Sequence, residues 1–144
     1  MSGIVLAAID LAHPEHHTSI LTKAASMAEI DDASIAVVTV IPDFGMSIVG
    51  SFFEEGAEQK ALNDAGVALH EIVSQVLGAE KAAQIKHVVL HGTAYEEILE
   101  AARDINAQLI VMGAHRPNFQ DYLIGPNASR VVRHSRCSVL ILRD

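Results

Sequence analysis

The fold of this chain is decided by residues 109–142, LIVMGAHRPNFQDYLIGPNASRVVRHSRCSVLIL. The apolar run before Gly113 is too short for a helix and rich in branched side chains, so we expect a buried strand over 109–112. Pro126 stands where the first turn of a helix would begin, which predicts a short helix over 126–134 and a last strand over 138–142. A loop that runs from the carboxyl end of a strand to a helix N-terminus offers unpaired backbone N–H groups. The stretch therefore predicts an anion site.

The rest of the chain alternates apolar runs with amphipathic stretches. Strands are expected over 4–9, 34–41 and 85–90, each an apolar run bounded by turn signals. Helices are expected between 14 and 30, over 57–77 and from 94 to about 106, where apolar residues recur at helical spacing. Thr93 and Glu96 fit a capping box at the start of the last of these. The alternation predicts an α/β fold, one domain spanning 1–144, with a mostly parallel sheet covered by helices on both faces.

Composition excludes several classes of protein. The 144 residues carry a net charge of −8, which argues against binding to nucleic acid or to an acidic membrane surface. No run of 18 apolar residues offers a membrane span, and the first residues lack the basic region of a signal peptide. The single cysteine, Cys137, cannot form an internal disulfide and is expected to be a small core residue. We therefore expect a cytoplasmic protein. Residues 42–56 form one irregular segment, unusually apolar for a connection, which we expect to cover some surface.

Ligands of such sheets bind beyond the carboxyl ends of the strands, where the strand order reverses. Residues expected there are Asp10, Val40 with Ile41, and those from Gly113 onward. The Asp10 carboxylate suits a ribose hydroxyl or a divalent cation, and the alternative role is to cap the following turn. Asp10 is therefore the candidate ligand-binding carboxylate at the carboxyl ends of the strands.

The loop after Gly113 carries the groups that phosphate recognition needs. His115 and Arg116 lie within it, and the Arg guanidinium presents fork-shaped donors suited to phosphate. At the helix start, Ser129 offers a hydroxyl, while Asn127 and Ala128 offer backbone N–H groups that the first turn leaves unpaired. The alternative is a connection whose glycines serve only tight turns.

Other groups of residues give weaker evidence for a functional site. His13, Glu15, His16 and His17 match no zinc spacing, and solvated histidines at a helix start explain them better. No Walker lysine follows a glycine-rich loop, and no residue stands out as a base that positions an attacking water. The residues therefore favour binding over fast turnover.

Several stretches together resemble the universal stress protein family. They are a first strand that ends at Asp10, then Met112-Gly113-Ala114-His115, Gly125-Pro126-Asn127-Ala128-Ser129, and the closing strand from Cys137 to Leu142. Nucleotide-binding members have Gly, two residues, Gly, nine residues, Gly and a hydroxyl residue. Here Arg116 replaces the second glycine, eight residues precede Gly125, and Pro126 replaces the hydroxyl residue. The loop resembles a subgroup of short bacterial members thought to bind adenine nucleotides.

The resemblance implies a flavodoxin-like (Rossmann-like) three-layer α/β/α sandwich with a five-stranded sheet of order 3-2-1-4-5. It implies ATP (or AMP or ADP) with Mg²⁺, which Asp10 would meet indirectly through Mg-ATP. It also implies a homodimer, commonly through the last strand, here Val139 to Leu142. Some members hydrolyse ATP slowly or phosphorylate themselves. The cofactor-binding residues implied, from adenine through ribose to phosphates, are Ile9, Val40, Met112, Asp10, Gly113, His115, Arg116, Gly125, Asn127, Ala128 and Ser129.

Two other interpretations stay open. In the first, the altered loop has closed the phosphate cradle, and the chain is a nucleotide-free dimeric interaction module of the same fold. In the second, it is an adenylating α/β enzyme. The residues after the first strand, Asp-Leu-Ala-His-Pro, count against that interpretation because such enzymes carry a Ser/Gly-rich loop there.

Overall fold

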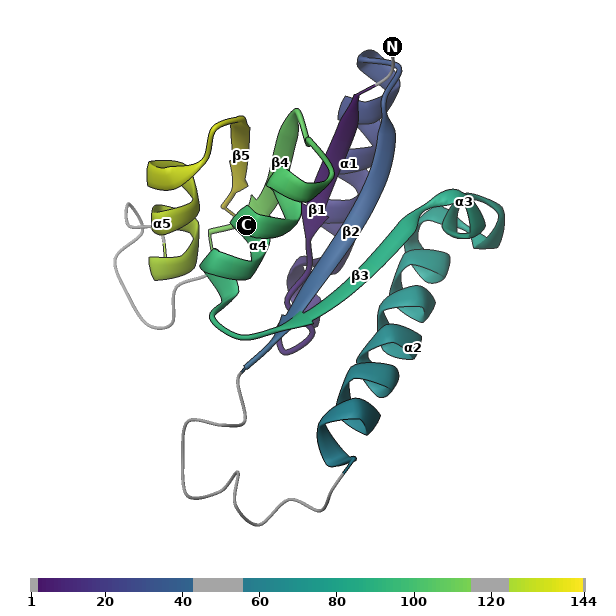
Figure 1. Ribbon diagram of the computed structural model, residues 1–144. Helices are drawn as coiled ribbons and strands as arrows, with labels where there is room; N and C mark the ends of the chain where they lie inside the picture. Colours follow the sequence, from purple (N-terminus) through teal and green to yellow (C-terminus); the bar gives the residue numbers. More distant parts are fainter. Residues whose placement is uncertain (1–2, 43–55, 115–124, 144) are drawn as a thin grey trace.

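The structure is a computed structural model that describes residues 3–42, 56–114 and 125–143. Strands and helices alternate along the chain as the sequence predicts (Figure 1). In chain order they are β1 (Ile4–Ala8), the 3-10 helix η1 (Pro14–His16), α1 (His17–Ile30), β2 (Ser34–Ile41), α2 (Ala57–Leu77), α3 (Ala79–Gln84), β3 (Lys86–His91), α4 (Ala94–Asp104), β4 (Leu109–Gly113), α5 (Pro126–His134) and β5 (Ser138–Leu142).

Within the described residues, the five strands form one parallel sheet of order β3-β2-β1-β4-β5. The central strand is β1, in which Val5 pairs with Ile35 of β2 on one side and with Leu109 of β4 on the other. The order implied by the family resemblance, 3-2-1-4-5, is confirmed. It places the reversal of strand order between β1 and β4.

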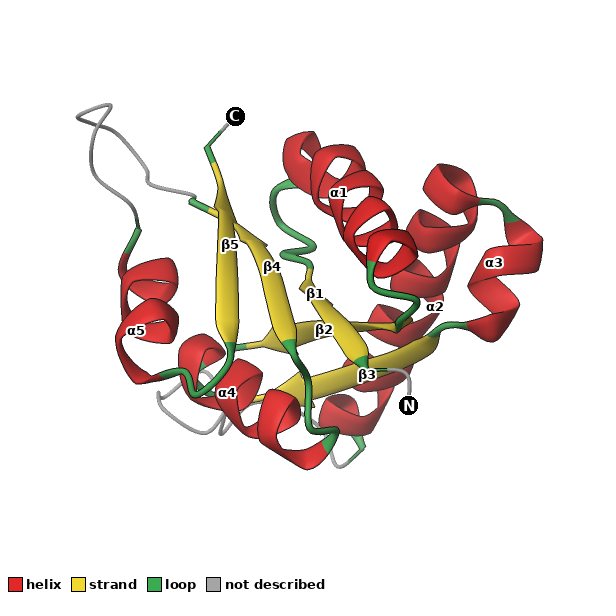
Figure 2. Ribbon diagram, turned by 90° about the horizontal axis from the view of Figure 1, so that it is seen from above, coloured by secondary structure: helices red, strands yellow, loops and turns green. Residues whose placement is uncertain are grey.

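Helices cover both faces of the sheet (Figure 2), with α1, α2 and α3 on one face and α4 and α5 on the other. Val5 lies in the first core with Leu21 of α1, whereas Leu6, the next residue, lies in the second core with Ile98 of α4. Successive side chains of a strand point to opposite faces, so an almost wholly apolar strand fills both cores. Burying one such side chain contributes about 1.5–3 kcal/mol. The predicted three-layer sandwich is confirmed.

Most predicted boundaries match the structure. The bounds of β2, α2, α5 and β5 are those expected, while β1 ends one residue earlier and β3 lies one residue later than predicted. The first helix begins as the 3-10 turn η1 before α1 continues it. The sequence pattern does not predict the short helix α3. Gly78, at φ 94°, ends α2, and the chain then forms this extra helix before β3.

The predicted capping box at α4 is wrong. Thr93 is the N-cap residue, but its side chain makes no capping hydrogen bond, and the Glu96 carboxylate accepts instead from the Tyr95 hydroxyl at 3.2 Å. The chain enters α4 through Gly92 at φ 137°, and Glu97 folds back over this turn, with its Cγ 3.2 Å from where a Cβ on Gly92 would lie. Glu97, rather than Glu96, therefore approaches the chain at this turn.

No helix in the described part of the chain is both long and apolar enough to cross a membrane. Of the apolar segment 42–56, residues 43–55 lie outside the described residues, so its expected covering role stays a prediction.

Candidate functional site

A cavity of about 920 Å³ lies at the carboxyl ends of β1, β2 and β4. Its walls come from the turn after β1, from the start of α1, from one side of α2 and from the first turns of α4 and α5. The chain leaves β1 toward α1 on one face of the sheet and leaves β4 toward α5 on the other face (Figures 1 and 2). These two departures open a crevice at the place where ligands of open parallel sheets bind.

Most of the predicted site residues with described positions line this cavity. Those that line it are Ile9, Asp10, Val40, Met112, Gly113, Asn127 and Ala128. Gly125 and Ser129 are not among the lining residues. Gly125 is buried just before α5, and Ser129 is exposed, its amide donating to the Gly125 carbonyl at 2.9 Å. His115 and Arg116 lie outside the described residues.

The turn after β1 is organised around Asp10. Its carboxylate Oδ1 accepts from the Ala12 amide at 2.9 Å, which is the alternative, turn-capping role. Its backbone carbonyl accepts from the His13 amide at 3.0 Å and from His17 Nε2 at 2.8 Å. The Asp10 side chain lines the cavity and remains 62% exposed, and its Oδ2 lies 3.8 Å from His13 Nε2. One carboxylate therefore both closes the turn and remains open to a ligand.

Two histidines near this turn also contact Glu15. His13 and His16 line the cavity, and both approach Glu15, His13 Nδ1 at 3.2 Å and His16 Nε2 at 3.9 Å from its Oε1. A hydrogen bond from its own backbone amide is the main cause that lowers the pKa of Glu15, with His13 and His16 adding to this. Among the described residues, no three His, Cys, Asp or Glu side chains gather closely enough to hold a metal ion. The turn after β1 and the start of α1 therefore bring a carboxylate and histidine rings to the cavity wall.

The α2 wall was missed by sequence reasoning. Ala61, Ala65 and Ala68 line the cavity together with Asp64, which also pairs with Lys60 at 2.8 Å. These alanines share one helix face, but that spacing is the ordinary pattern of a helix face packed on a core. Their small side chains leave open space beside β2, and no local signal separates this from close packing.

The opposite wall is formed by α4 and α5. Ala94 and Ile98 of α4 line it, as do Pro126, Asn127 and Ala128 of α5. Gly125 is the N-cap residue of α5 and supplies no side-chain cap, so the first-turn amides that follow Pro126 gain no side-chain partner at the cap. Such a helix start attracts negative charge through its amides and its dipole. Pro126 itself has no N–H, which removes one donor.

Fold and cavity together define the class of protein, a parallel α/β domain with a ligand crevice at the switch point of its sheet. The model of the universal stress protein family matches residues 1–143, and the chain belongs to this family. The family that the sequence resemblance implied is thereby confirmed.

Individual relatives agree with this assignment. The chain is 30% identical over 139 residues to universal stress protein A homolog 1 of Coxiella burnetii, covering 94% of this chain and 92% of that one. It is 37% identical over 60 residues to universal stress protein G of Shigella flexneri, a match that spans only 42% of either chain.

Two solved structures share the fold. Protein MJ0577 of Methanocaldococcus jannaschii superposes with a TM-score of 0.75 at 20% identity, covering 100% of this chain and 97% of that one. A universal stress protein in complex with cAMP superposes with a TM-score of 0.61 at 18% identity, covering 99% of this chain and 97% of that one.

Proposed function

We propose that this chain binds an adenine nucleotide, ATP or its products ADP and AMP, in the cavity at the carboxyl edge of its sheet, as part of a stress response. One observation carries the proposal. The cavity joins a carboxylate at the end of β1 to the N-terminus of α5 across the end of the sheet. A nucleotide carries hydroxyls and phosphates a few bonds apart, so its hydroxyls could meet the carboxylate while its phosphates meet the helix N-terminus.

The cavity walls suit the parts of a nucleotide. Its volume falls within the roughly 300–1,000 Å³ common for small-molecule sites. Ile9 and Val40 are apolar and would flank the adenine, while Asp10 and Gly113 lie where the ribose would follow. Asn127 and Ala128 are at the start of α5, near which the phosphates would end. A universal stress protein of the same fold is described with cAMP, itself an adenine nucleotide, which supports this ligand class.

Phosphate binding would depend on side-chain charge more than in a glycine-only loop. Arg116 stands where the family motif has glycine, and Pro126 removes an N–H, so we propose that the Arg116 guanidinium supplies the missing donors. His115, Gly125 and Ser129 complete the proposed phosphate contacts.

Magnesium fits this site only as a companion of the nucleotide. Asp10 is an exposed carboxylate at the cavity, and among the described residues it belongs to no group of three His, Cys, Asp or Glu that could hold a metal ion. Mg²⁺ keeps several waters and takes its other ligands from substrate phosphates, so one carboxylate acting through water is sufficient. When bound, Mg²⁺ would neutralise phosphate charge.

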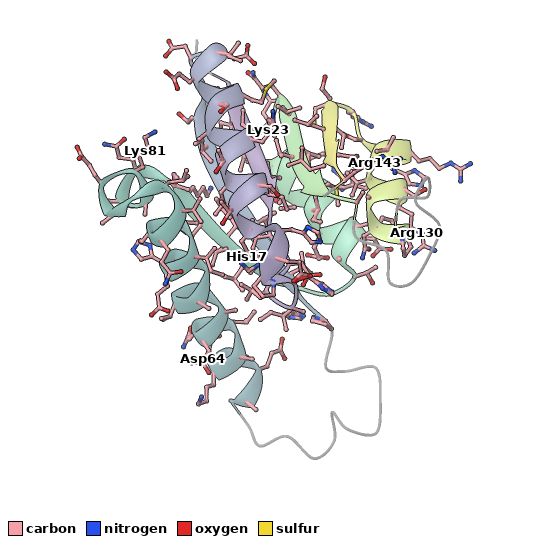
Figure 3. All side chains as sticks on the ribbon, turned by 180° about the vertical axis from the view of Figure 1, so that it is seen from behind. His17, Lys23, Asp64, Lys81, Arg130 and Arg143 are labelled. Carbon is pink, nitrogen blue, oxygen red and sulfur yellow. The ribbon has the colours of Figure 1, made fainter. Side chains whose placement is uncertain are left out.

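Titration calorimetry with ATP tests the proposal. Wild-type protein should bind ATP, and its melting temperature should rise, because a ligand at 100 times its Kd stabilises the native state by about 2.7 kcal/mol. Arg116→Ala should lower the affinity and leave the melting temperature of the free protein unchanged. Lys81→Ala on α3 (Figure 3), an exposed cation that does not line the cavity, is the matched control and should bind like the wild type. Absence of binding and of a thermal shift at millimolar ATP would refute the proposal.

A nucleotide-free dimeric interaction module is the second candidate, and the outer edge of β5 offers the dimer surface that it needs. This strand is the last of the sheet and pairs only with β4 among the described strands, while Val139 to Leu142 are half-buried. An apolar strand with an open edge invites pairing with another strand. We propose a homodimer through this edge, compatible with either candidate. Mass spectrometry of the denatured purified protein separates the two, since only a nucleotide-binding protein should release ATP, ADP or AMP.

A further inference from the structure

His17 is a buried histidine at the ligand cavity. It is the first residue of α1, is 6% exposed and lines the cavity below the end of β1. Figure 3 places it at the start of α1, at the end of the sheet where the strands finish. Its ring is turned toward the chain that leaves β1, where Nε2 lies 2.8 Å from the Asp10 carbonyl oxygen.

The partner of this imidazole determines its tautomer. A carbonyl oxygen only accepts, so Nε2 must carry the hydrogen in the bond to Asp10. In the opposite neutral tautomer, two lone pairs would face each other at 2.8 Å. The His17 ring in the folded protein is therefore expected to carry a hydrogen on Nε2.

This hydrogen bond controls the turn that carries the Asp10 carboxylate. The same carbonyl also accepts from the His13 amide at 3.0 Å, and the carboxylate of the same residue accepts from the Ala12 amide at 2.9 Å. His17 is the only one of these donors that belongs to the body of α1, so it ties the turn to the helix. The other two bonds join residues within the turn itself.

Packing beneath the turn gives His17 a fixed base. Ile20, one turn further along α1, is 3% exposed and also lines the cavity. Its Cδ1 lies 3.6 Å from where a Cβ on Gly113 would stand. Helix and sheet are therefore in close contact at this point, and the position of His17 is set by the core.

We propose that His17 is a positioning residue of the nucleotide site, which holds the Asp10 carboxylate where the ribose hydroxyls of the ligand arrive. The inference rests on the proposed function and adds to it a residue that acts through Asp10. A purely structural role would predict a loss of stability alone. A positioning role predicts a selective loss of ribose recognition.

Comparison of ATP with 2′,3′-dideoxy-ATP measures that selectivity. In the wild type, loss of hydrogen bonds to the charged Asp10 should weaken dideoxy-ATP binding at least about tenfold relative to ATP. His17→Phe keeps an aromatic ring of similar size and removes the donor. This variant should bring the ratio of the dideoxy-ATP and ATP dissociation constants close to one, while changing the affinity for dideoxy-ATP less than about threefold. His17→Gln restores an N–H donor and should recover part of the ratio. His70→Phe, a histidine outside the cavity lining, should leave the ratio unchanged.

The outcomes separate the two proposals. If the wild type binds neither nucleotide, the proposed function fails. If it prefers ATP and His17→Phe keeps that preference, the inference about His17 is overturned and the proposed function stands. Should His17→Phe fail to fold, nitrogen NMR of the wild-type imidazole still decides, since a hydrogen on Nδ1 rather than Nε2 would overturn the inference.

Discussion

Gly113→Ala, at the end of β4, should change the stability of the fold and the affinity for the nucleotide in opposite directions. Gly113 lines the cavity, and its backbone is not in the left-handed region, so alanine is conformationally allowed there. A Cβ at this position would lie 3.6 Å from Ile20 Cδ1 and 4.0 Å from His16 Cγ. Both distances are ordinary van der Waals contacts, so no neighbour has to move.

The expected effect on stability follows from this geometry. Replacing Gly by Ala at an unstrained position stabilises a protein by roughly 0.4–1 kcal/mol, because the unfolded chain loses conformational freedom. For a chain of this length that corresponds to a rise in melting temperature of about 1–4 °C. Thermal unfolding followed by circular dichroism measures this shift.

The expected effect on the ligand is opposite in sign. A methyl group added to a well-packed site costs about 1–3 kcal/mol, and 1.4 kcal/mol is about tenfold in affinity. If the ribose packs against Gly113, ATP affinity should therefore fall at least about fivefold in calorimetry. Gly66→Ala in α2 is the matched control, because its Cβ would lie 3.8 Å from Val89 and outside the cavity lining. It should stabilise the fold and leave ATP affinity unchanged.

Two results would refute this reasoning. A marked fall in the melting temperature of Gly113→Ala would mean that the space beside Ile20 is smaller than the distances indicate. An ATP affinity within about threefold of the wild type would mean that the ligand does not approach Gly113.

The remaining predictions concern pH, assembly and the phosphate loop. Burial, together with the nearby His70 ring, lowers the pKa of His87 in the folded protein, so the unfolded chain takes up a proton more readily. Titration of His87 therefore leaves the free energy of unfolding unchanged well above the ordinary pKa of 6.5 and lowers it as the pH falls below that value. Denaturant titrations of His87→Phe at several pH values should show a weaker loss of stability in acid. The Leu142 carbonyl accepts from Ala114 beside β4, and amide direction alternates along a strand, so the Ile141 N–H faces the free edge. Ile141→Pro should therefore give a folded monomer in analytical ultracentrifugation. The control Leu140→Pro removes an amide on the β4 side and should unfold the sheet edge. A dimeric Ile141→Pro would place the interface elsewhere. In the phosphate loop, Arg116→Lys keeps the charge but loses the guanidinium fork, so its ATP affinity in calorimetry should lie between those of the wild type and Arg116→Ala.

Much of the fold was determined by local sequence pattern. β2, α2, α5 and β5 begin and end where apolar runs, helical spacing, Pro126 and Gly78 predict, because these signals act within a few residues of chain. The double-faced apolar character of β1 likewise predicts a parallel sheet with helices on both sides. The place of Asp10 at the cavity follows from the sequence alone, because it is the residue with which that strand's apolar run ends.

Tertiary structure decided what shares the cavity. Ala61 and Ala65 follow the same spacing as core residues, and only the docking of α2 beside β2 makes them a cavity wall. The sequence predicts that His17 is solvated, yet it is buried with its ring on the Asp10 carbonyl. Both depend on where helices rest on a sheet whose strand order no local pattern encodes, so the contacts that shape the site arise only when distant segments pack together.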